Sequence, residues 1–133
     1  MLLDLAQLPP GPFGPLVVLF AFVVVHALAD FGLQGPFLAQ AKNRGADLSA
    51  YFGESPPPGV WVHALTAHCL MHAGGIWLVS GSVVLGAVEL VLHWVIDFAK
   101  SQRIFGFHVD QALHLTCKVG YVAALYFLPA GTF

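Results

Sequence analysis

The stretch VLHWVIDFAK, residues 91–100, decides how the rest of the chain is interpreted. Most of its residues suit a helix in lipid, yet a histidine, an aspartate and a lysine lie along one side of that helix. Its core, His93-x-x-x-Asp97-Phe, has a near copy at His26-x-x-x-Asp30-Phe. The two elements predict an integral membrane protein with a buried polar site.

The composition supports this prediction. The chain is 58% hydrophobic and 9% charged, with a mean hydropathy of +0.79, which soluble domains seldom reach. Its 133 residues have room for about four spans of about 20 residues. We therefore expect one all-α domain over residues 1–133, a four-transmembrane-helix bundle. A net charge of −2 without a basic stripe excludes a nucleic-acid partner.

Stretches rich in proline, glycine and serine indicate where the spans end. We expect the four spans over residues 16–34, 60–79, 82–100 and 109–128. After the first span, PFLAQAKNRG favours a short interfacial helix, and GADLSAYFGESPPPG favours a loop. Basic residues fall between spans one and two and between spans three and four. The positive-inside rule therefore places these loops in the cytoplasm and both termini outside. The start of the chain lacks a basic region and a cleavage site, so we expect no signal peptide.

Polar residues inside the spans recur at steps of four, which places them on one face of each helix. They are His26, Asp30 and Gln34 in span one, Glu89, His93 and Asp97 in span three, and Asp110, His114 and Lys118 in span four. Each ionised residue costs about 2.5–3.5 kcal/mol against lipid. These side chains must therefore face one another inside the bundle.

The antiparallel register of neighbouring spans indicates which polar residues lie at one depth. Spans three and four pair Glu89 with Lys118, His93 with His114, and Asp97 with Asp110. Spans one and two, in a weaker register, pair Asp30 with His63 and His26 with His68. We expect a buried ion pair between Glu89 and Lys118. Two close carboxylates, Asp97 and Asp110, repel unless a proton or a cation lies between them.

A divalent metal would resolve that repulsion. Imidazole and carboxylate suit Zn, Mn or Fe, and ligands of this kind projecting into a four-helix bundle hold one or two ions. The predicted ligands are His26, Asp30, His63, His93, Asp97, Asp110 and His114. We interpret His72 and His108 as hydrogen-bonded core residues. Whether His68 and His72, which share a helix face, join the site stays open.

The two H-x-x-x-D-F elements lie on spans that run in the same direction. This predicts a parallel internal repeat in which spans one and two match spans three and four.

Taken together, the motifs resemble a known family. They are H-x-x-x-D-F-x-x-Q (His26, Asp30, Phe31, Gln34), a lysine (Lys42), a histidine opening the next span (His63), H-x-x-x-D-x-x-K (His93, Asp97, Lys100) and D-Q-x-x-H (Asp110, Gln111, His114). This pattern resembles small bacterial integral membrane proteins known as domain of unknown function 3307, which implies a bacterial inner-membrane location and no particular activity. A looser similarity is to bacterial membrane-bound metal-dependent hydrolases, although Trp94 stands where they carry an arginine.

Our leading functional hypothesis is a metal-dependent membrane hydrolase. It would act on a phosphate ester or similar polar group of a lipid or small amphiphile at the cytoplasmic interface. Asp97 and Asp110 would be catalytic, and metal-bound water would be the nucleophile. The residues expected to contact substrate or to orient the ligands are Lys42, Lys100, Gln34 and Gln111. The oligomeric state stays open, a homo-oligomer included.

Three alternatives use the same residues. One is a subunit of a metal-ion or proton transporter or channel, although the outer halves of spans one and four offer almost no polar residues for a path. Another is a haem-binding electron carrier with axial histidines such as His26 and His68. The third is a non-catalytic membrane partner subunit whose ion pairs only fix the bundle.

Overall fold

The computed structural model describes residues 10–129 and residue 132. Within this part of the chain the elements are α1 (Gly14–Ala27), the π-helical segment η1 (Leu28–Gly32), α2 (Pro36–Ala41), α3 (Ser49–Phe52), α4 (Val60–Ser80), α5 (Val83–Ser101) and α6 (Phe107–Phe127). No strand occurs among the described residues, so the all-α prediction is confirmed. The expectations for the first nine residues lie outside the described residues.

The four long helical segments begin and end within about two residues of the predicted spans because local signals set their ends. A proline occupies the first turn of α1, where its fixed φ suits a helix start. Gly81 adopts a left-handed conformation, with φ 72°, that ends α4. The Ser82 hydroxyl then accepts a hydrogen bond from the Leu85 N–H at 3.1 Å and caps α5.

Segment η1 continues α1 with a wider turn. The Leu33 N–H donates to the Leu28 carbonyl at 2.8 Å, which is the i to i+5 bond of a π-helix. Single π-helical turns change the face on which the following side chains project, and they occur often at functional sites. Asp30 lies inside this turn.

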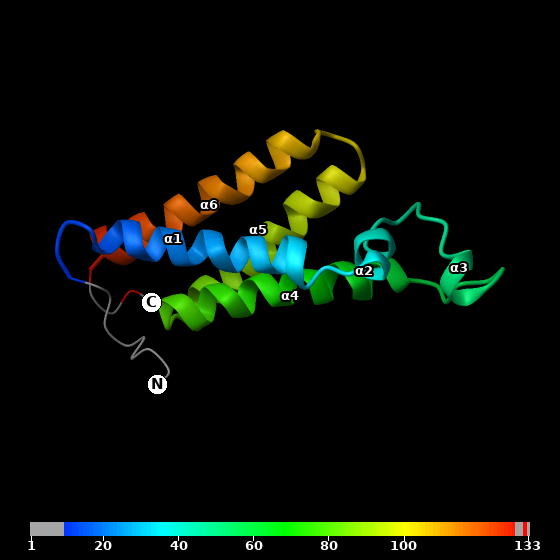
Figure 1. Ribbon diagram of the computed structural model, residues 1–133, viewed down its shortest axis with the longest axis horizontal. Coiled ribbons are helices and arrows are strands. Elements are labelled where there is room, and N and C mark those ends of the chain that lie inside the picture. The colour runs from blue at the N-terminus through cyan, green and yellow to red at the C-terminus, as the bar shows by residue number, and fades with distance from the viewer. Residues whose placement is uncertain (1–9, 130–131, 133) are drawn as a thin grey trace.

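The segment between η1 and α4 contains two short helices beyond the end of α1 (Figure 1). Helix α2 matches the predicted short helix. The prediction of a loop is wrong for Ser49–Phe52, which form the single turn α3. The Asp47 carboxylate accepts the Ser49 N–H at 2.9 Å at the start of this turn, which lowers the pKa of Asp47. Leu48 packs with Ala41 and Ala64, which ties the turn to α2 and α4.

Helices α1, α4, α5 and α6 lie side by side as a bundle (Figure 1), with the most extensive contact between α4 and α5. Small residues permit this close approach. A Cβ added to Gly86 of α5 would lie 3.0 Å from the carbonyl oxygen of Ala73 in α4. A Cβ added to Gly75 of α4 would overlap Val25 of α1. These glycines therefore hold the helix axes close together around the bundle interior.

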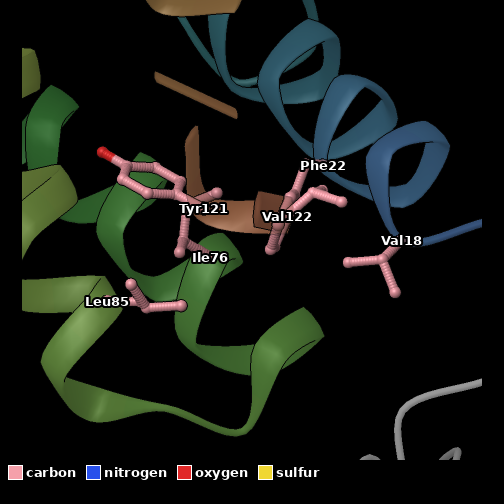
Figure 2. Packing of buried hydrophobic residues seen from close by; sticks show 6 residues of the cluster. All are labelled: Val18, Phe22, Ile76, Leu85, Tyr121 and Val122. Atoms are coloured by element: carbon pink, nitrogen blue, oxygen red, sulfur yellow. The ribbon is translucent and has the colours of Figure 1, made fainter. Parts of the chain in front are cut away.

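One end of the bundle has an apolar core (Figure 2). Figure 2 shows its residues Val18, Phe22, Ile76, Leu85, Tyr121 and Val122, which come from all four long helices. The rings of Phe22 and Tyr121 meet edge to face, 6.3 Å apart. This core lies at the end where the turn between α4 and α5 is found. The polar side chains of the four helices lie further along the bundle.

Two helical segments are long and apolar enough to cross a membrane, by length and composition alone: Gly14–Gly32 and Val60–Ser80. Helices α5 and α6 also have the length, but they carry charged side chains along it. The four-span bundle therefore stays a prediction.

Candidate metal centre

Five histidines converge where the four long helices face one another. They are His26, His68, His72, His93 and His114. The ring of His93 stacks on His72 at a centroid distance of 3.7 Å and on His114 at 4.0 Å. All but His26 are almost fully buried. Imidazoles at this density supply nitrogen ligands of the kind that zinc and iron prefer.

Asp30 is the carboxylate that η1 directs toward this cluster. Its Oδ1 lies 3.1 Å from His72 Nε2 and 3.3 Å from His68 Nε2. Its Oδ2 lies 3.3 Å from His26 Nε2. One carboxylate thus contacts three imidazoles, and two of them, His68 and His72, can converge with it on a cation.

Asp97 is the corresponding carboxylate on α5. Its Oδ1 lies 3.3 Å from His114 Nε2, and its Oδ2 lies 3.4 Å from His68 Nε2. The same Oδ2 accepts a hydrogen bond from Lys42 Nζ at 2.6 Å. The aspartates of the two H-x-x-x-D elements therefore both face His68, so the two elements belong to one cluster.

Among the described residues, two groups can each hold a metal ion. They are Asp30, His68, His72 and His93, and His93, Asp97 and His114, with all ligand atoms of a group within 4.8 Å of one another. Ligands bound at about 2.0–2.1 Å around a tetrahedral ion lie about 3.3 Å apart. His68 Nε2 lies 3.3 Å from both Asp30 Oδ1 and His93 Nε2. The donor set and its spacing therefore fit a divalent cation.

His93 belongs to both groups, and a buried network fixes its orientation. Its Nδ1 lies 3.0 Å from Glu89 Oε1, so it donates to that carboxylate and leaves Nε2 free for a ligand. Glu89 also accepts hydrogen bonds from Lys118 and, at 2.7 Å, from the Tyr121 hydroxyl. A single nitrogen lone pair binds one ion. The two groups therefore cannot both use His93 for separate ions.

Gln111 links the carboxylates of Asp30 and Asp110. The Gln111 side-chain amide donates to Asp30 Oδ2 at 3.0 Å and to Asp110 Oδ2 at 3.2 Å. Its carbonyl oxygen lies 3.3 Å from His26 Nε2 and can accept from it. Asp110 Oδ1 is buried, lies 3.5 Å from His114 Nε2 and has no hydrogen-bond partner among the described residues. Asp110 therefore has an oxygen available for a cation, a water or a proton.

A cavity of about 50 Å³ opens beside this cluster. Its lining consists of Asp30, Phe31, Gln34, Lys42, Asp97, Lys100, Phe107, Asp110 and Gln111. These include every residue that the sequence predicted to contact substrate. Lys100 Nζ lies 6.0 Å from the Phe107 ring centroid, and the Gln34 side-chain oxygen has no hydrogen-bond partner in the described part of the chain. The cavity thus presents cationic and amide groups next to the candidate ligands.

Several positions differ from the sequence-based predictions. His63, a predicted ligand, is exposed on α4 and lies outside both groups, because it projects away from the face that carries His68. His68 and His72, five and nine residues further along α4, take its place. Lys42, which the sequence predicted to contact substrate at the cytoplasmic interface, is 7% exposed and paired with Asp97. His108 is exposed, so its interpretation as a core residue is wrong.

The register explains these differences. The predicted pairing of Glu89 with Lys118 is present, and the His93 and His114 rings stack as their pairing requires. Between the first and second spans, Asp30 pairs with His68 and His72 rather than His63. The π-helical turn and the long connection shift that register in a way that sequence spacing does not reveal.

The fold and the cluster define a class of protein: an all-α bundle with a buried histidine and aspartate centre. The chain belongs to the family described as "Protein of unknown function (DUF3307)", whose model matches residues 18–129. No curated protein and no solved structure matches the chain.

Proposed function

We propose that this protein is a membrane-embedded hydrolase that uses one divalent metal ion to cleave a phosphate ester or similar polar group at the cytoplasmic face. One observation carries the proposal: a set of imidazole and carboxylate atoms with metal-ligand spacing lies beside a cavity whose lining includes two lysines and three aspartates. The fold supplies the ligands, and the cavity supplies room for an anionic group. The following observations support each part.

The distribution of side chains supports a membrane location for all four long helices. The charged residues of α5 and α6 are mostly buried, as for Glu89, Asp97, Asp110 and Lys118. Their outer faces expose large apolar side chains, among them Val83, Val91, Val95, Leu115 and Val119. An apolar exterior around a charged interior suits lipid and is costly in water. This favours a multi-pass protein with four spans.

The basic residues support the orientation. Lys42 and Arg44 follow α2, and Lys100 and Arg103 lie at the end of α5. Both positions are at the bundle end that carries the cavity. By the positive-inside rule this end faces the cytoplasm of a bacterial inner membrane, with both termini outside. Membrane lipid or a lipid-linked, phosphorylated compound would then reach the cavity from the interface. A homo-oligomer is compatible with this arrangement.

The charge balance favours one ion rather than two. Lys42 Nζ is 2.6 Å from Asp97 Oδ2, beside the group formed by His93, Asp97 and His114. An ammonium group there neutralises Asp97 and repels a second cation. In the group with Asp30, His68, His72 and His93, no ligand is paired directly with a lysine among the described residues. We place the ion there, with Zn, Mn or Fe as candidates for its mixed nitrogen and oxygen donors.

The residues around the ion have separable roles. A bound divalent cation activates water near neutral pH and polarises a phosphoryl oxygen. Asp110, whose Oδ1 receives no hydrogen bond from the described residues, would accept the proton from the attacking water. Lys100 would neutralise the substrate phosphate, Lys42 would help to orient it while paired with Asp97, and Gln34 and Gln111 would fix its position. Asp97 would hold Lys42 and His114 in place.

The apolar core favours a hydrolase over a transporter. A transport path must continue past the site to the other end of the bundle. That end is filled by Val18, Phe22, Ile76 and Leu85, and by Val122 beside them. The site therefore opens at a polar cavity and is closed by apolar packing at the other end. This arrangement suits hydrolysis at an interface. The His72 ring packs between His26 and His68, with centroid distances of 5.0 Å and 4.7 Å. This packing argues against a porphyrin held between His26 and His68.

The test is elemental analysis of the detergent-purified full chain, followed by assays of phosphatidic acid and p-nitrophenyl phosphate hydrolysis. We expect about one divalent ion per chain, lost in the double variant His68→Gln/His93→Gln and retained in the exposed-histidine control His63→Gln. Zinc or proton flux into liposomes without hydrolysis would favour the transporter. A well-folded protein that binds no divalent metal would contradict the proposal.

A further inference from the structure

Two arginines stand outside the metal centre and line a second, larger cavity. This arginine cavity has a volume of about 460 Å³. Its lining consists of Asn43, Arg44, Gly45, Ser101, Gln102 and Arg103. No carboxylate is in that lining. Two guanidinium groups in a lining that holds no carboxylate favour an anion there.

A side-chain contact positions Arg44, and the backbone of the turn after α5 positions Arg103. The Arg44 guanidinium lies 5.8 Å from the ring centroid of Trp61, a cation–π contact that limits the motion of the side chain. Arg103 has φ 61°, a left-handed conformation that is uncommon for residues with a side chain. Its N–H donates to the Lys100 carbonyl at 2.9 Å in the turn after α5. Local strain of this kind is often found at ligand-binding positions.

The arginine cavity adjoins the cavity of the metal centre along the chain. Lys42 lines the smaller cavity, and Asn43 and Arg44 line the larger. On the other side, Lys100 lines the smaller cavity, and Arg103 lines the larger. The chain has five lysines and arginines, and four of them therefore line these two cavities. The same two segments, residues 42–44 and 100–103, supply the cations of both cavities.

We propose that the arginine cavity binds a phosphate group, and that the substrate class is an amphiphile whose headgroup carries two anionic groups. One group would lie at Lys42 and Lys100 beside the ion, and the other would be held by Arg44 and Arg103. Arginine suits this role because its planar fork binds phosphate through two parallel hydrogen bonds. The assignment of two anionic groups to one substrate rests on the proposed hydrolase function, whereas phosphate binding by the cavity does not.

The experiment measures binding rather than turnover. The full chain in detergent is titrated with inorganic phosphate by calorimetry, and native mass spectrometry measures its retention of phosphatidic acid against phosphatidylcholine. We expect Arg44→Gln/Arg103→Gln to weaken binding about tenfold or more, since two charge-assisted contacts are lost. Arg44→Lys/Arg103→Lys keeps the charge and should give an intermediate loss.

A control variant separates a specific site from general attraction. Ala39→Glu/Ala50→Glu changes the net charge by the same amount at exposed positions in the same connection. We expect it to leave binding within about twofold at moderate salt, since screening weakens distant charges. An equal loss in this control, or wild-type binding by the double arginine variant, would overturn the inference.

The outcomes also distinguish a lipid headgroup from a soluble phosphate ester. They separate the proposed anion site from the proposed hydrolase function. Phosphatidic acid that is retained and displaced by inorganic phosphate indicates a lipid headgroup. Phosphate binding without lipid retention indicates a soluble ester. Binding of neither probe overturns the arginine cavity as an anion site. Arginine-dependent binding in a protein that hydrolyses no ester would sink the hydrolase proposal and leave the anion site standing.

Discussion

The bundle contains two buried pairs of a lysine with a carboxylate, and they differ in what surrounds them. Lys118 pairs with Glu89, whose other oxygen accepts the Tyr121 hydroxyl beside the apolar core. Lys42 pairs with Asp97 at 2.6 Å in the lining of the small cavity. Both lysines are almost fully buried.

The difference indicates two roles for the same chemical pair. Among the described residues, the hydrogen-bonding partners of Glu89 are the buried side chains of Lys118, Tyr121 and His93. Its Oε1 lies 3.0 Å from His93 Nδ1 and orients that ring. Around Asp97 the contacts lead to the cavity and to His114 at 3.3 Å. The first pair therefore fixes the interior of the bundle, and the second adjusts charge at the mouth of the site. Four changes test this comparison.

The largest effect is expected from Lys118→Met. It leaves the Glu89 carboxylate buried without its cation, which should lower the free energy of unfolding by about 3–5 kcal/mol. Chemical unfolding in detergent measures this loss. The double variant Lys118→Met/Glu89→Gln should recover most of it, since no uncompensated charge stays buried. A cost below about 0.5 kcal/mol, as expected of an exposed surface change, would contradict an essential role for the inner pair.

Metal removal comes next. A ligand present at 100 times its dissociation constant stabilises the native state by about 2.7 kcal/mol, so chelation should lower the unfolding midpoint measurably. The effect should vanish in His68→Gln, which lacks one ligand, and persist in His63→Gln. Differential scanning fluorimetry with and without chelator makes the comparison. An equal shift in both variants would show that the chelator acts elsewhere.

Glu89→Gln tests the link from the inner pair to the ion. The amide keeps an acceptor for Lys118 but no longer carries the charge that polarises His93. We expect metal affinity to fall about 10–100-fold, as is typical when the partner of a ligating histidine is changed. Competition with a chromogenic zinc chelator measures it. Unchanged affinity, in a variant that stays folded, would remove Glu89 from the metal site.

Lys42→Met tests the outer pair and should have the smallest effect on stability, about 1–3 kcal/mol, since Asp97 keeps its contacts with His114 and with the cavity. Its clearer signature is metal content. Without the ammonium group, the carboxylates of Asp97 and Asp110 can attract a second cation, so elemental analysis should rise from about one ion toward two. A content that stays at one ion would mean that Lys42 does not limit occupancy.

The sequence predicted most of the fold because helix ends and apolar runs are local properties. The four long helical segments follow from proline, glycine and serine positions and from the hydropathy between them. Helix α3 was missed because a single turn gives no periodic signal. Two of the three predicted pairings of α5 with α6 are present, because a short connection fixes the register of an antiparallel hairpin. They placed His93 with His114 and Glu89 with Lys118.

The metal-site ligands were predicted less completely. Of the predicted ligands, Asp30, His93, Asp97 and His114 belong to the two candidate groups, and His26 and Asp110 only contact members of them. His63 lies outside, whereas His68 and His72 belong to a group. The π-helical turn at Asp30 and the loop of α2 and α3 change the register, and neither leaves a signal in residue spacing. The burial of Lys42 follows from the packing of α2 onto α4, which local sequence does not encode.

By itself the sequence determined which residues had to be inside: charged side chains on otherwise apolar helices are costly to leave against apolar surroundings, so they must contact one another. Only the tertiary structure decided which of them meet. Helix axes approach closely at Gly75 and Gly86, the wider turn redirects Asp30, and Lys42 reaches Asp97 from another segment of the chain. Distances between atoms on different helices depend on packing along the whole bundle, so the set of ligands emerges only when the bundle is assembled.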